Sequence, residues 1–575
     1  MRNSSGCGHR WAITMMTAFV TLTFAAACAG DDEATTPPSP TAPAGDPAPE
    51  AEGPAAAETA EAAPTEAPPT PTPAARPGDP SAPVDAAVTL RELDCAEQLP
   101  GYVESRTPDG VTNPRLSCWA MNTLEDYTAD PDDPASRRID VTYYVWESAA
   151  PVDERAPDPI AYLPGGPRGS AFNSLIPFTA NDIAGNRDLI LMDTRGNSPL
   201  PGDDTGLPAS ACPELYDSAL EIFAVNEPIE TEYAILTAGW QACVDRLRDE
   251  GWDLDQYNTP NAVEDLDQLR RALGHDVWNI YGESYSTRYA LHYMATYPDA
   301  VRSAVIDSAT PPDTDIWAPA TVGAAVDAVF DQIVAGCAAS AECAAAHPDL
   351  RGALETAVAR LDATPRQVDV AHPLTGEVVT VSIDGRDFAF GLGELFDASL
   401  LPTIPGILAA IAGGEDALID ASAGRLLGLA DGGLGLSGAT VCHDFGGEPG
   451  RFMAGADDAS ATADPWQHLG YLSNMPCEII GVTPAPAGFT DPVTSEVPAL
   501  VVVGMLDSAT LPADGLRVAE TLGAATLAVF DHESHVPVRT SSCARSVVVA
   551  FWDALGDVDL ACVAEANTRP ITYGG

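Results

Sequence analysis

The chain has 575 residues, which is enough for a large hydrophobic core or for more than one domain. Acidic residues number 84 against 28 basic ones, all of them arginine, and the formal net charge at pH 7 is −56. A charge of this sign argues against nucleic acids and anionic membrane surfaces as partners. The composition says little about the fold, and it fits a high-GC source and a salt-adapted source equally.

The first 28 residues have the composition of an export signal. Arg2 and Arg10 are the only formal charges there, and the apolar stretch Trp11–Ala27 is too short and too threonine-rich for a membrane span. Three alanines stand before Cys28 and resemble a bacterial lipobox, although Ala25 stands where leucine is usual. The sequence therefore predicts an exported protein, either a cell-envelope lipoprotein anchored through Cys28 or a plainly secreted one.

Residues 29–88 form a low-complexity segment rich in proline, alanine, threonine and acidic residues. Such a segment cannot bury enough apolar surface to fold, and its prolines keep it extended. We expect a disordered linker that holds a folded domain away from the envelope. A ligand for a proline-binding domain is the alternative.

The cysteines also indicate export. Of 12 cysteines, Cys7 and Cys28 lie in the signal, and the remaining even set in an exported chain is typical of disulfides. These cysteines fall into near neighbours along the chain, and the expected pairs are Cys95–Cys118, Cys212–Cys243, Cys337–Cys343, Cys442–Cys477 and Cys543–Cys562. Because the chain has no C-x-x-C spacing and no histidines clustered near cysteines, we expect no metal and no cofactor.

From residue 89 onward, short apolar runs alternate with helical patterns. Continuous apolar runs are typical of strands that are buried on both faces of a parallel sheet. We expect strands at Arg137–Glu147, Ile160–Leu163, Leu189–Asp193, Val277–Tyr281, Val301–Asp307, Pro498–Gly504 and Thr526–Phe530. Helical patterns cover 231–249 and 261–273. Strands that alternate with helices predict an α/β fold, with a mostly parallel sheet flanked by helices.

The alternation stops between residues 311 and 490, where the chain is rich in alanine, glycine and leucine and its pattern is largely helical. Because this region stands between two predicted sheet strands, we expect a helical cap over one end of the sheet, inserted ahead of the strand 498–504. The core then consists of an N-terminal part, 89–310, and a C-terminal part, 491–575.

Ser284 lies at a sharp transition from the predicted strand to a helical pattern. A nucleophile elbow needs this layout, and the residues two before and two after the serine must be small because the turn is strained. Gly282 meets this requirement, and Ser286 stands where glycine is usual but is also small. The motif alone is weak, and a serine in an ordinary turn is the alternative.

A serine hydroxyl needs a histidine base, and the histidine needs a carboxylate that orients it. On this fold the acid and then the histidine follow late strands. Asp507 follows the predicted strand that ends at Gly504, and His535 follows the last predicted strand. Asp514 and His532 are the rivals; Asp507 is favoured because it is nearer its strand, and His535 because it lies deeper in its loop.

The oxyanion of acyl transfer needs two backbone N–H groups aimed at the developing charge. One should come from Tyr285, the residue after the candidate nucleophile. The other should come from the turn Pro164–Pro167, where Gly165 or Gly166 allows close approach of the backbone. A plain Pro-Gly turn is the alternative.

Five motifs now stand in order along the chain: Pro164-Gly165-Gly166-Pro167, Asp193-Thr194-Arg195-Gly196, Tyr281-Gly282-Glu283-Ser284-Tyr285-Ser286-Thr287, Gly504-Met505-Leu506-Asp507-Ser508-Ala509-Thr510, and His535. Together they resemble the α/β-hydrolase family of proline iminopeptidases and secreted actinobacterial tripeptidyl aminopeptidases. The resemblance covers about 160–310 and 440–565, with a divergent cap between them. Its motifs are specific for the fold and the triad, and much less specific for the substrate.

The resemblance implies a triad of Ser284, Asp507 and His535, with Gly165 and Tyr285 as oxyanion donors. The departures from the family are Pro164 in place of histidine, Arg168 in place of glycine and Ser286 in place of glycine. They bear on the shape of the oxyanion loop more than on the triad. Arg195 is expected to pin its loop through an ion pair, with a surface arginine as the alternative.

The sequence thus predicts an exported serine hydrolase, an aminopeptidase that removes short peptides of the tripeptidyl or prolyl type from free N-termini through an acyl-enzyme. Carboxylates near the acyl pocket must then bind the α-ammonium group; the candidates are Glu283 and acids of the cap such as Asp444, with a solvated acid at the elbow as the alternative for Glu283. The alternatives are an esterase or other small-molecule hydrolase on the same triad, and a non-catalytic, surface-tethered binding protein. We expect a monomer whose partner is a peptide or small-molecule substrate and which touches a membrane only through a lipid anchor.

Overall fold

The computed structural model of the protein describes residues 88–95, 115–198, 210–224, 227–426, 435–446 and 476–573, apart from 168, 172–173, 175–177, 179–182, 394, 397–398 and 570. All of them belong to one compact unit that begins at Arg76. The predicted export signal, its Cys28 and the linker up to residue 87 lie outside the described residues.

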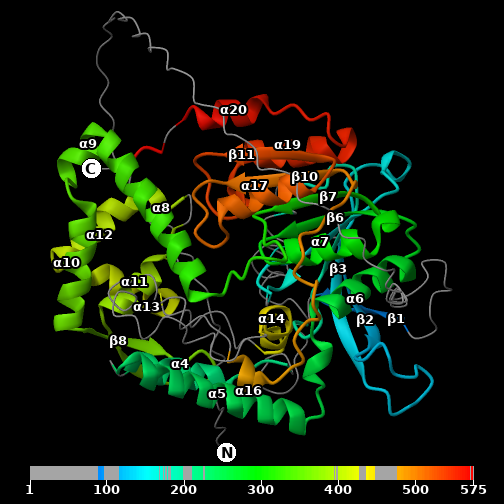
Figure 1. The fold of residues 1–575 in the computed structure, drawn as a ribbon, viewed down its shortest axis with the longest axis horizontal. Helices are drawn as coiled ribbons and strands as arrows, with labels where there is room; N and C mark the ends of the chain where they lie inside the picture. The colour runs from blue at the N-terminus through cyan, green and yellow to red at the C-terminus, as the bar shows by residue number, and fades with distance from the viewer. Residues whose placement is uncertain are drawn as a thin grey trace, which may run out of the picture. The chain divides into compact units, whose positions relative to one another are not determined.

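A nine-stranded sheet forms the centre of this unit (Figure 1), in the order β1-β2-β3-β5-β4-β6-β7-β10-β11. Its strands are β1 (Thr89–Leu93), β2 (Leu116–Leu124), β3 (Arg138–Trp146), β4 (Ile160–Leu163), β5 (Leu189–Met192), β6 (Trp278–Glu283), β7 (Val301–Asp307), β10 (Ala499–Gly504) and β11 (Ala525–Phe530). Neighbours from β5 through β11 pair in parallel, and β1, β2 and β3 pair antiparallel at the other edge. The predicted, mostly parallel sheet is confirmed.

The parallel strands consist of apolar runs because both of their faces are covered. Every residue of β4, β5, β6 and β10 is buried. Figure 1 shows α17 (Pro512–Thr521) and α19 (Ser542–Ala554) beside β10 and β11, and α7 (Ser286–Thr296) beside β6. Burial on two faces favours Val, Ile and Leu at consecutive positions, as β10 has.

The remaining core helices are α4 (Glu214–Ala224), α5 (Ile229–Asp249), α6 (Thr259–Ala272) and α20 (Ala561–Asn567), with short helices η1 (Val152–Glu154), η2 (Leu254–Gln256), η3 (Pro298–Ala300) and α18 (Pro537–Thr540). The predicted helices at 231–249 and 261–273 correspond to α5 and α6. The start of α6 is set locally, because the Asn258 side chain accepts a hydrogen bond of 2.8 Å from Asn261 N.

The region 311–490 is mainly helical, as expected. Its described elements are α8 (Pro319–Ala339), α9 (Ala341–Ala346), α10 (Leu350–Ala363), β8 (Arg366–Ala371), β9 (Val378–Ile383), α11 (Gly385–Gly393), η4 (Leu401–Thr403), α12 (Ile404–Ala412), α13 (Ala417–Leu426), α14 (Ser437–Phe445) and α16 (Cys477–Ile480). The antiparallel pair β8–β9 was not anticipated. We refer to this region as the cap.

The cap has its own hydrophobic cluster, to which α4, Leu506 and Tyr573 of the core also contribute. Leu220 and Phe223 of α4 are buried in this cluster. So is Leu506, which directly precedes Asp507. The cap therefore packs on residues adjacent to the candidate site, and its contacts include a hydrogen bond of 2.9 Å from Gln332 on α8 to the backbone carbonyl of Met505.

Among the described helices, α8 is the one that is long and apolar enough, by length and composition, to cross a membrane, over Thr321–Ala339. Its Phe330 and Ile333 are buried in the cap cluster. Its Asp327 and Asp331 both pair with Arg351 on α10. These contacts identify α8 as a core helix of the cap.

All five expected disulfides are present, as Cys95–Cys118, Cys212–Cys243, Cys337–Cys343, Cys442–Cys477 and Cys543–Cys562. Their Cα–Cα distances lie between 5.1 and 5.8 Å, within the normal range for a disulfide. Cross-links of this kind stabilise a fold by about 2–4 kcal/mol each, mainly by restricting the unfolded chain. Such a set of disulfides is typical of exported proteins.

Candidate active site

Ser284 occupies the turn between β6 and α7 in a strained conformation. Its φ angle is 54°, a value that non-glycine residues rarely adopt. The turn is held from both sides, because Ser284 N donates to Asp307 O at 2.9 Å and Thr287 N donates to Ser284 O at 3.0 Å. A Cβ on Gly282 would lie 2.8 Å from Ser286 O and 2.9 Å from Thr287 Cα, so only glycine fits there. This is the geometry of a nucleophile elbow.

Asp507 and His535 are directly paired at the carboxyl ends of β10 and β11. His535 Nδ1 lies 3.0 Å from Asp507 Oδ1 and 2.9 Å from Asp507 Oδ2. Asp507 is 2% exposed. Its oxygens also accept hydrogen bonds from Ala509 N at 2.9 Å, from Thr510 N at 2.8 Å and from the Thr510 hydroxyl at 2.8 Å. Three donors besides the imidazole thus hold the carboxylate in place.

The rival acid is engaged elsewhere. Asp514 lies on α17 and is bonded to Thr314 Oγ1 at 2.9 Å and to Arg517 at 2.9 Å. Asp507, the acid nearer its strand, is the one that contacts His535, as predicted. Thr510 was not foreseen; it lies three residues after the acid, a spacing at which a threonine can bond an aspartate through both its backbone and its hydroxyl.

The loop that carries His535 is attached to the elbow. Val536 N donates to the Ser308 hydroxyl at 2.8 Å. Ser308 directly follows Asp307, whose carbonyl accepts the hydrogen bond from Ser284 N. Within the described part of the chain, no hydrogen bond joins the Ser284 hydroxyl to the His535 ring. Catalytic hydrogen bonds are often long without substrate and shorten when substrate binds. The structure therefore brings the Asp507–His535 pair and Ser284 to one end of the sheet.

The charges of the pair support each other. Burial alone would lower the pKa of His535, but the Asp507 carboxylate outweighs burial and raises it above 6.5. Burial would raise the pKa of Asp507, yet the His535 ring and the Thr510 hydrogen bonds hold it below 3.8. An ionised Asp507 keeps a proton on His535 Nδ1 and leaves Nε2 free to accept one.

Gly165 lies directly against the elbow. A Cβ at this position would be 2.9 Å from Glu283 O, 2.9 Å from Ser284 Cβ and 3.5 Å from Ser284 Oγ. Its neighbour Gly166 has φ 134°, which favours glycine. Tyr285 stands at the N-terminal end of α7, where backbone N–H groups have no partner within the helix. This layout accords with the predicted oxyanion donors, whose role stays a prediction.

Ser286, which stands where the family has glycine, links the elbow to the oxyanion turn. It is fully buried. Its hydroxyl donates to Leu163 O at 2.6 Å and accepts from Glu283 N at 2.9 Å. Leu163 ends β4 immediately before Pro164 and Gly165. The replacement of glycine by Ser286 therefore adds a hydrogen bond that holds the end of β4, next to the oxyanion turn. Another departure, Arg168, lies outside the described residues.

Glu283, a predicted candidate for binding a substrate ammonium group, is buried and already paired with protein donors. Its side chain is 2% exposed. The Tyr162 hydroxyl donates to Oε1 at 2.6 Å, and Arg539 Nε donates to Oε2 at 3.1 Å. Glu283 therefore fastens the elbow to α18, which follows the His535 loop.

Asp444, the other named candidate, is also paired with protein donors. Its side chain is fully buried and accepts hydrogen bonds from Thr259, Tyr285 and Arg288, at 2.6, 3.0 and 2.8 Å, and from His443 Nδ1 at 2.8 Å. Burial would raise the pKa of Asp444, but Arg288, His443 and Thr259 together outweigh burial and the pKa falls to about 2. Asp444 thus holds the cap helix α14 against α6 and α7, a contact that no local sequence pattern could indicate.

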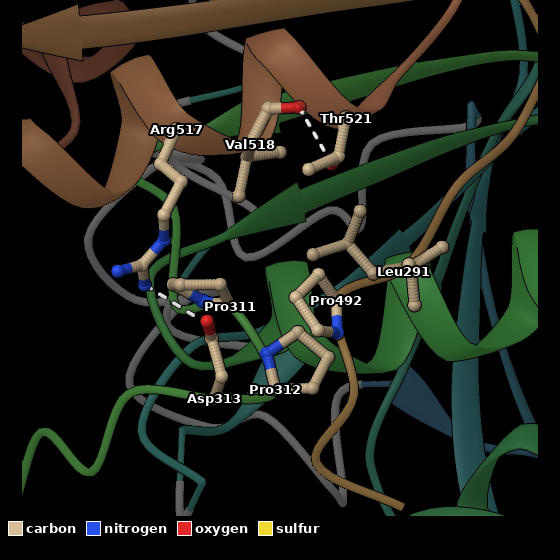
Figure 2. Close-up of a pocket in the computed structure, with 9 residues that line it drawn as sticks. Leu291, Pro311, Pro312, Asp313, Pro492, Arg517, Val518 and Thr521 are labelled. Carbon is tan, nitrogen blue, oxygen red and sulfur yellow. Dashed lines mark hydrogen bonds and ion pairs between the residues drawn. The ribbon is translucent and has the colours of Figure 1, made fainter. Parts of the chain in front are cut away.

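A cysteine-containing cluster and a groove of the described residues lie apart from the triad. Among the residues that the structure describes, the one group with metal-like spacing is Cys212, Glu214 and Cys243, and its two cysteines are joined in a disulfide. Figure 2 shows a groove in which Leu291 and three prolines lie near the ion pair of Arg517 and Asp313. The candidate triad is not among its lining residues.

Two segments of the sequence match known families. Residues 158–347 match the family described as "alpha/beta hydrolase fold", and residues 463–555 match the family described as "TAP-like protein". The chain has an α/β-hydrolase fold with a TAP-like segment. Ser284 lies in the first segment of this α/β hydrolase, and Asp507 and His535 lie in the second.

Curated relatives match the chain over short stretches. The serine protease Hip1 of Mycobacterium tuberculosis is 34% identical over 102 residues, which is 18% of this chain and 19% of Hip1. A tripeptidyl aminopeptidase of Streptomyces coelicolor is 31% identical over 169 residues, 28% of this chain and 29% of that protein. The chain thus matches less than a third of the length of either relative.

Solved structures are similar at a distance. The proline iminopeptidase of Mycobacterium smegmatis has 15% identity and a TM-score of 0.32, over 72% of this chain and 95% of that chain. The structure of VinJ has 16% identity and a TM-score of 0.31, over 72% of this chain and 95% of that chain.

Proposed function

We propose that this TAP-like α/β hydrolase is an exported serine aminopeptidase that removes short peptides from free N-termini. The observation that carries the proposal is the buried Asp507–His535 pair, attached to a strained Ser284 at the end of the sheet. Five disulfides support an exported location. The peptidase part is supported by the named activities of the relatives, which match only segments of this chain.

In this mechanism the Ser284 hydroxyl attacks the carbonyl carbon of the substrate. His535 Nε2 takes the hydroxyl proton and then gives it to the leaving amine, while Asp507 stabilises the charged imidazolium. The N–H groups of Tyr285 and of the Gly165–Gly166 turn stabilise the oxyanion. The resulting acyl-enzyme is hydrolysed by water, which His535 activates in the same manner.

A free amine at the substrate would distinguish an aminopeptidase from an esterase on the same triad. Because Glu283 and Asp444 are occupied by protein donors, the α-ammonium group must be bound by another acid, and the cap contributes many. The cap packs beside Asp507 and would limit how many substrate residues reach Ser284.

The test is a panel of chromogenic substrates with the full chain and with Ser284→Ala. We expect wild type to cleave tripeptide or prolyl anilides with a free N-terminus and to react with a fluorophosphonate probe, and Ser284→Ala to do neither. Acetylation of the N-terminus should abolish cleavage. Turnover of esters without peptides would replace the aminopeptidase by an esterase, and activity retained by Ser284→Ala would refute the mechanism.

The dependence on pH follows from the paired histidine. His535 accepts a proton only when neutral, and Asp507 raises its pKa above 6.5. We therefore expect kcat/KM to be full at pH values above this pKa and to fall about tenfold per unit as the pH drops below it. A pH profile of kcat/KM on an uncharged substrate measures this acidic limb. A midpoint below 6.5 would contradict the pairing in the free enzyme.

A further inference from the structure

The strand β7 lies between the strand that leads to Ser284 and the strand that leads to Asp507. It ends at Asp307, whose side chain accepts a hydrogen bond of 2.6 Å from the Tyr281 hydroxyl. The next residue, Ser308, is 3% exposed and has φ 60°. A buried non-glycine residue in this conformation is uncommon, and the surrounding contacts must hold it.

Three hydrogen bonds at Asp307 and Ser308 join the three segments that carry Ser284, Asp507 and His535. Ser284 N donates to Asp307 O at 2.9 Å. Ser308 N donates at 3.1 Å to the carbonyl of Val502 on β10, the strand that precedes Asp507. Val536 N donates to the Ser308 hydroxyl at 2.8 Å. The first two bonds involve only backbone atoms, so the third is the one that depends on the identity of a side chain.

That third bond holds the peptide unit next to the candidate base. Val536 directly follows His535, is 2% exposed and has φ 55°. A β-branched residue at such a φ is strained and relaxes unless its backbone is held. The Ser308 hydroxyl binds the N–H of this strained residue, and that N–H belongs to the peptide unit shared with His535.

We propose that Ser308 is a positioning residue for His535, whose hydroxyl fixes the His535–Val536 peptide unit and thereby aims the imidazole at Ser284. The inference rests on the proposed function, because it assigns a role within the same triad. Ser308 touches neither substrate nor the reacting atoms, and it acts through His535. Misplacement of a catalytic base by about 1 Å is enough to reduce the rate up to ~100-fold.

Two substitutions distinguish the effect of the Ser308 hydroxyl from the effect of the strained backbone. Ser308→Gly removes the hydroxyl but suits a positive φ, whereas Ser308→Thr keeps the hydroxyl but adds a branch at a strained position. We expect Ser308→Gly to retain a Tm close to wild type and to lose about tenfold in kcat, with KM within about twofold. We expect Ser308→Thr to have the lower Tm and the higher kcat. A purely structural role would make kcat follow Tm instead.

The measurements are kcat, KM and Tm of the full chain with p-nitrophenyl acetate, together with labelling by a fluorophosphonate probe. Ser340→Gly is the matched control, because its hydroxyl also accepts a backbone N–H, from Cys343 at 3.4 Å in the cap; it should leave kcat unchanged. Full kcat in Ser308→Gly, with an active wild type, would overturn this inference alone. A wild type that neither labels nor hydrolyses would overturn the proposed function and this inference with it.

Discussion

Replacing Asp507 by asparagine is expected to lower kcat by about 10³–10⁴-fold. Asp507 Oδ1 accepts hydrogen bonds from the backbone N–H groups of Ala509 and Thr510. Because these donors need an acceptor, the amide oxygen of the asparagine would take the Oδ1 position. The amide NH₂ would then occupy the Oδ2 position, 2.9 Å from His535 Nδ1. A donor there favours the tautomer of neutral His535 that carries its proton on Nε2, where the ring cannot accept the Ser284 proton.

The measurement is kcat on the anilide or ester that wild type cleaves best, with Tm as a check on folding. Asp514→Asn is the matched control, because Asp514 is a second buried acid after β10 but is bonded to Thr314 and Arg517 rather than to a histidine. It should retain activity within about twofold. A loss in Asp514→Asn as large as that in Asp507→Asn, or nearly full activity in Asp507→Asn, would show that the pair is not the catalytic one.

The sequence could predict the Asp507–His535 pair because of a property of parallel sheets. Strands buried on both faces are visible as apolar runs, and their carboxyl ends meet at one edge. Residues that directly follow β6, β10 and β11 must therefore lie near each other, although more than 200 positions separate Ser284 from Asp507. The cysteine pairs were predictable for a different reason, since near neighbours in the chain are close in space at little cost in loop entropy.

The interactions of Glu283 and Asp444 were not predictable, because their partners come from remote segments. Glu283 pairs with Arg539, and Asp444 with Arg288, over 256 and 156 positions of sequence. No local pattern distinguishes an acid that lines a cleft from one that is neutralised inside the protein. The contribution of α4 to the cap cluster was missed for the same reason, since its apolar face predicts burial but does not indicate which cluster receives it.

Loss of Arg195 is expected to destabilise the fold strongly. It was expected to pin its loop through an ion pair, and it does so in a buried place, with side-chain exposures of 1% for Arg195 and 0% for Asp265. Arg195 Nε and Nη2 bind the two oxygens of Asp265 on α6 at 2.7 and 2.6 Å. Its Nη1 donates to the carbonyls of Glu125 at 2.7 Å and Gln256 at 2.9 Å. One side chain thus joins the loop after β5 to three other segments.

Arg195→Gln would leave the Asp265 carboxylate buried without its cation, together with two carbonyls that lose their donor. Breaking a buried pair from one side costs about 3–5 kcal/mol, because the remaining charge stays desolvated. We expect a decrease of this size in the free energy of unfolding, measured by urea denaturation of the full chain.

Arg91→Gln is the matched control, because the side chains of its ion pair with Asp140 are 57% and 30% exposed. An exposed pair contributes at most about 1 kcal/mol. Equal losses in the two variants would mean that burial does not set the strength of the Arg195 pair. A larger loss in Arg195→Gln, with the fluorophosphonate reaction of Ser284 retained in the folded fraction, would show that Arg195 acts on the scaffold rather than on the chemistry.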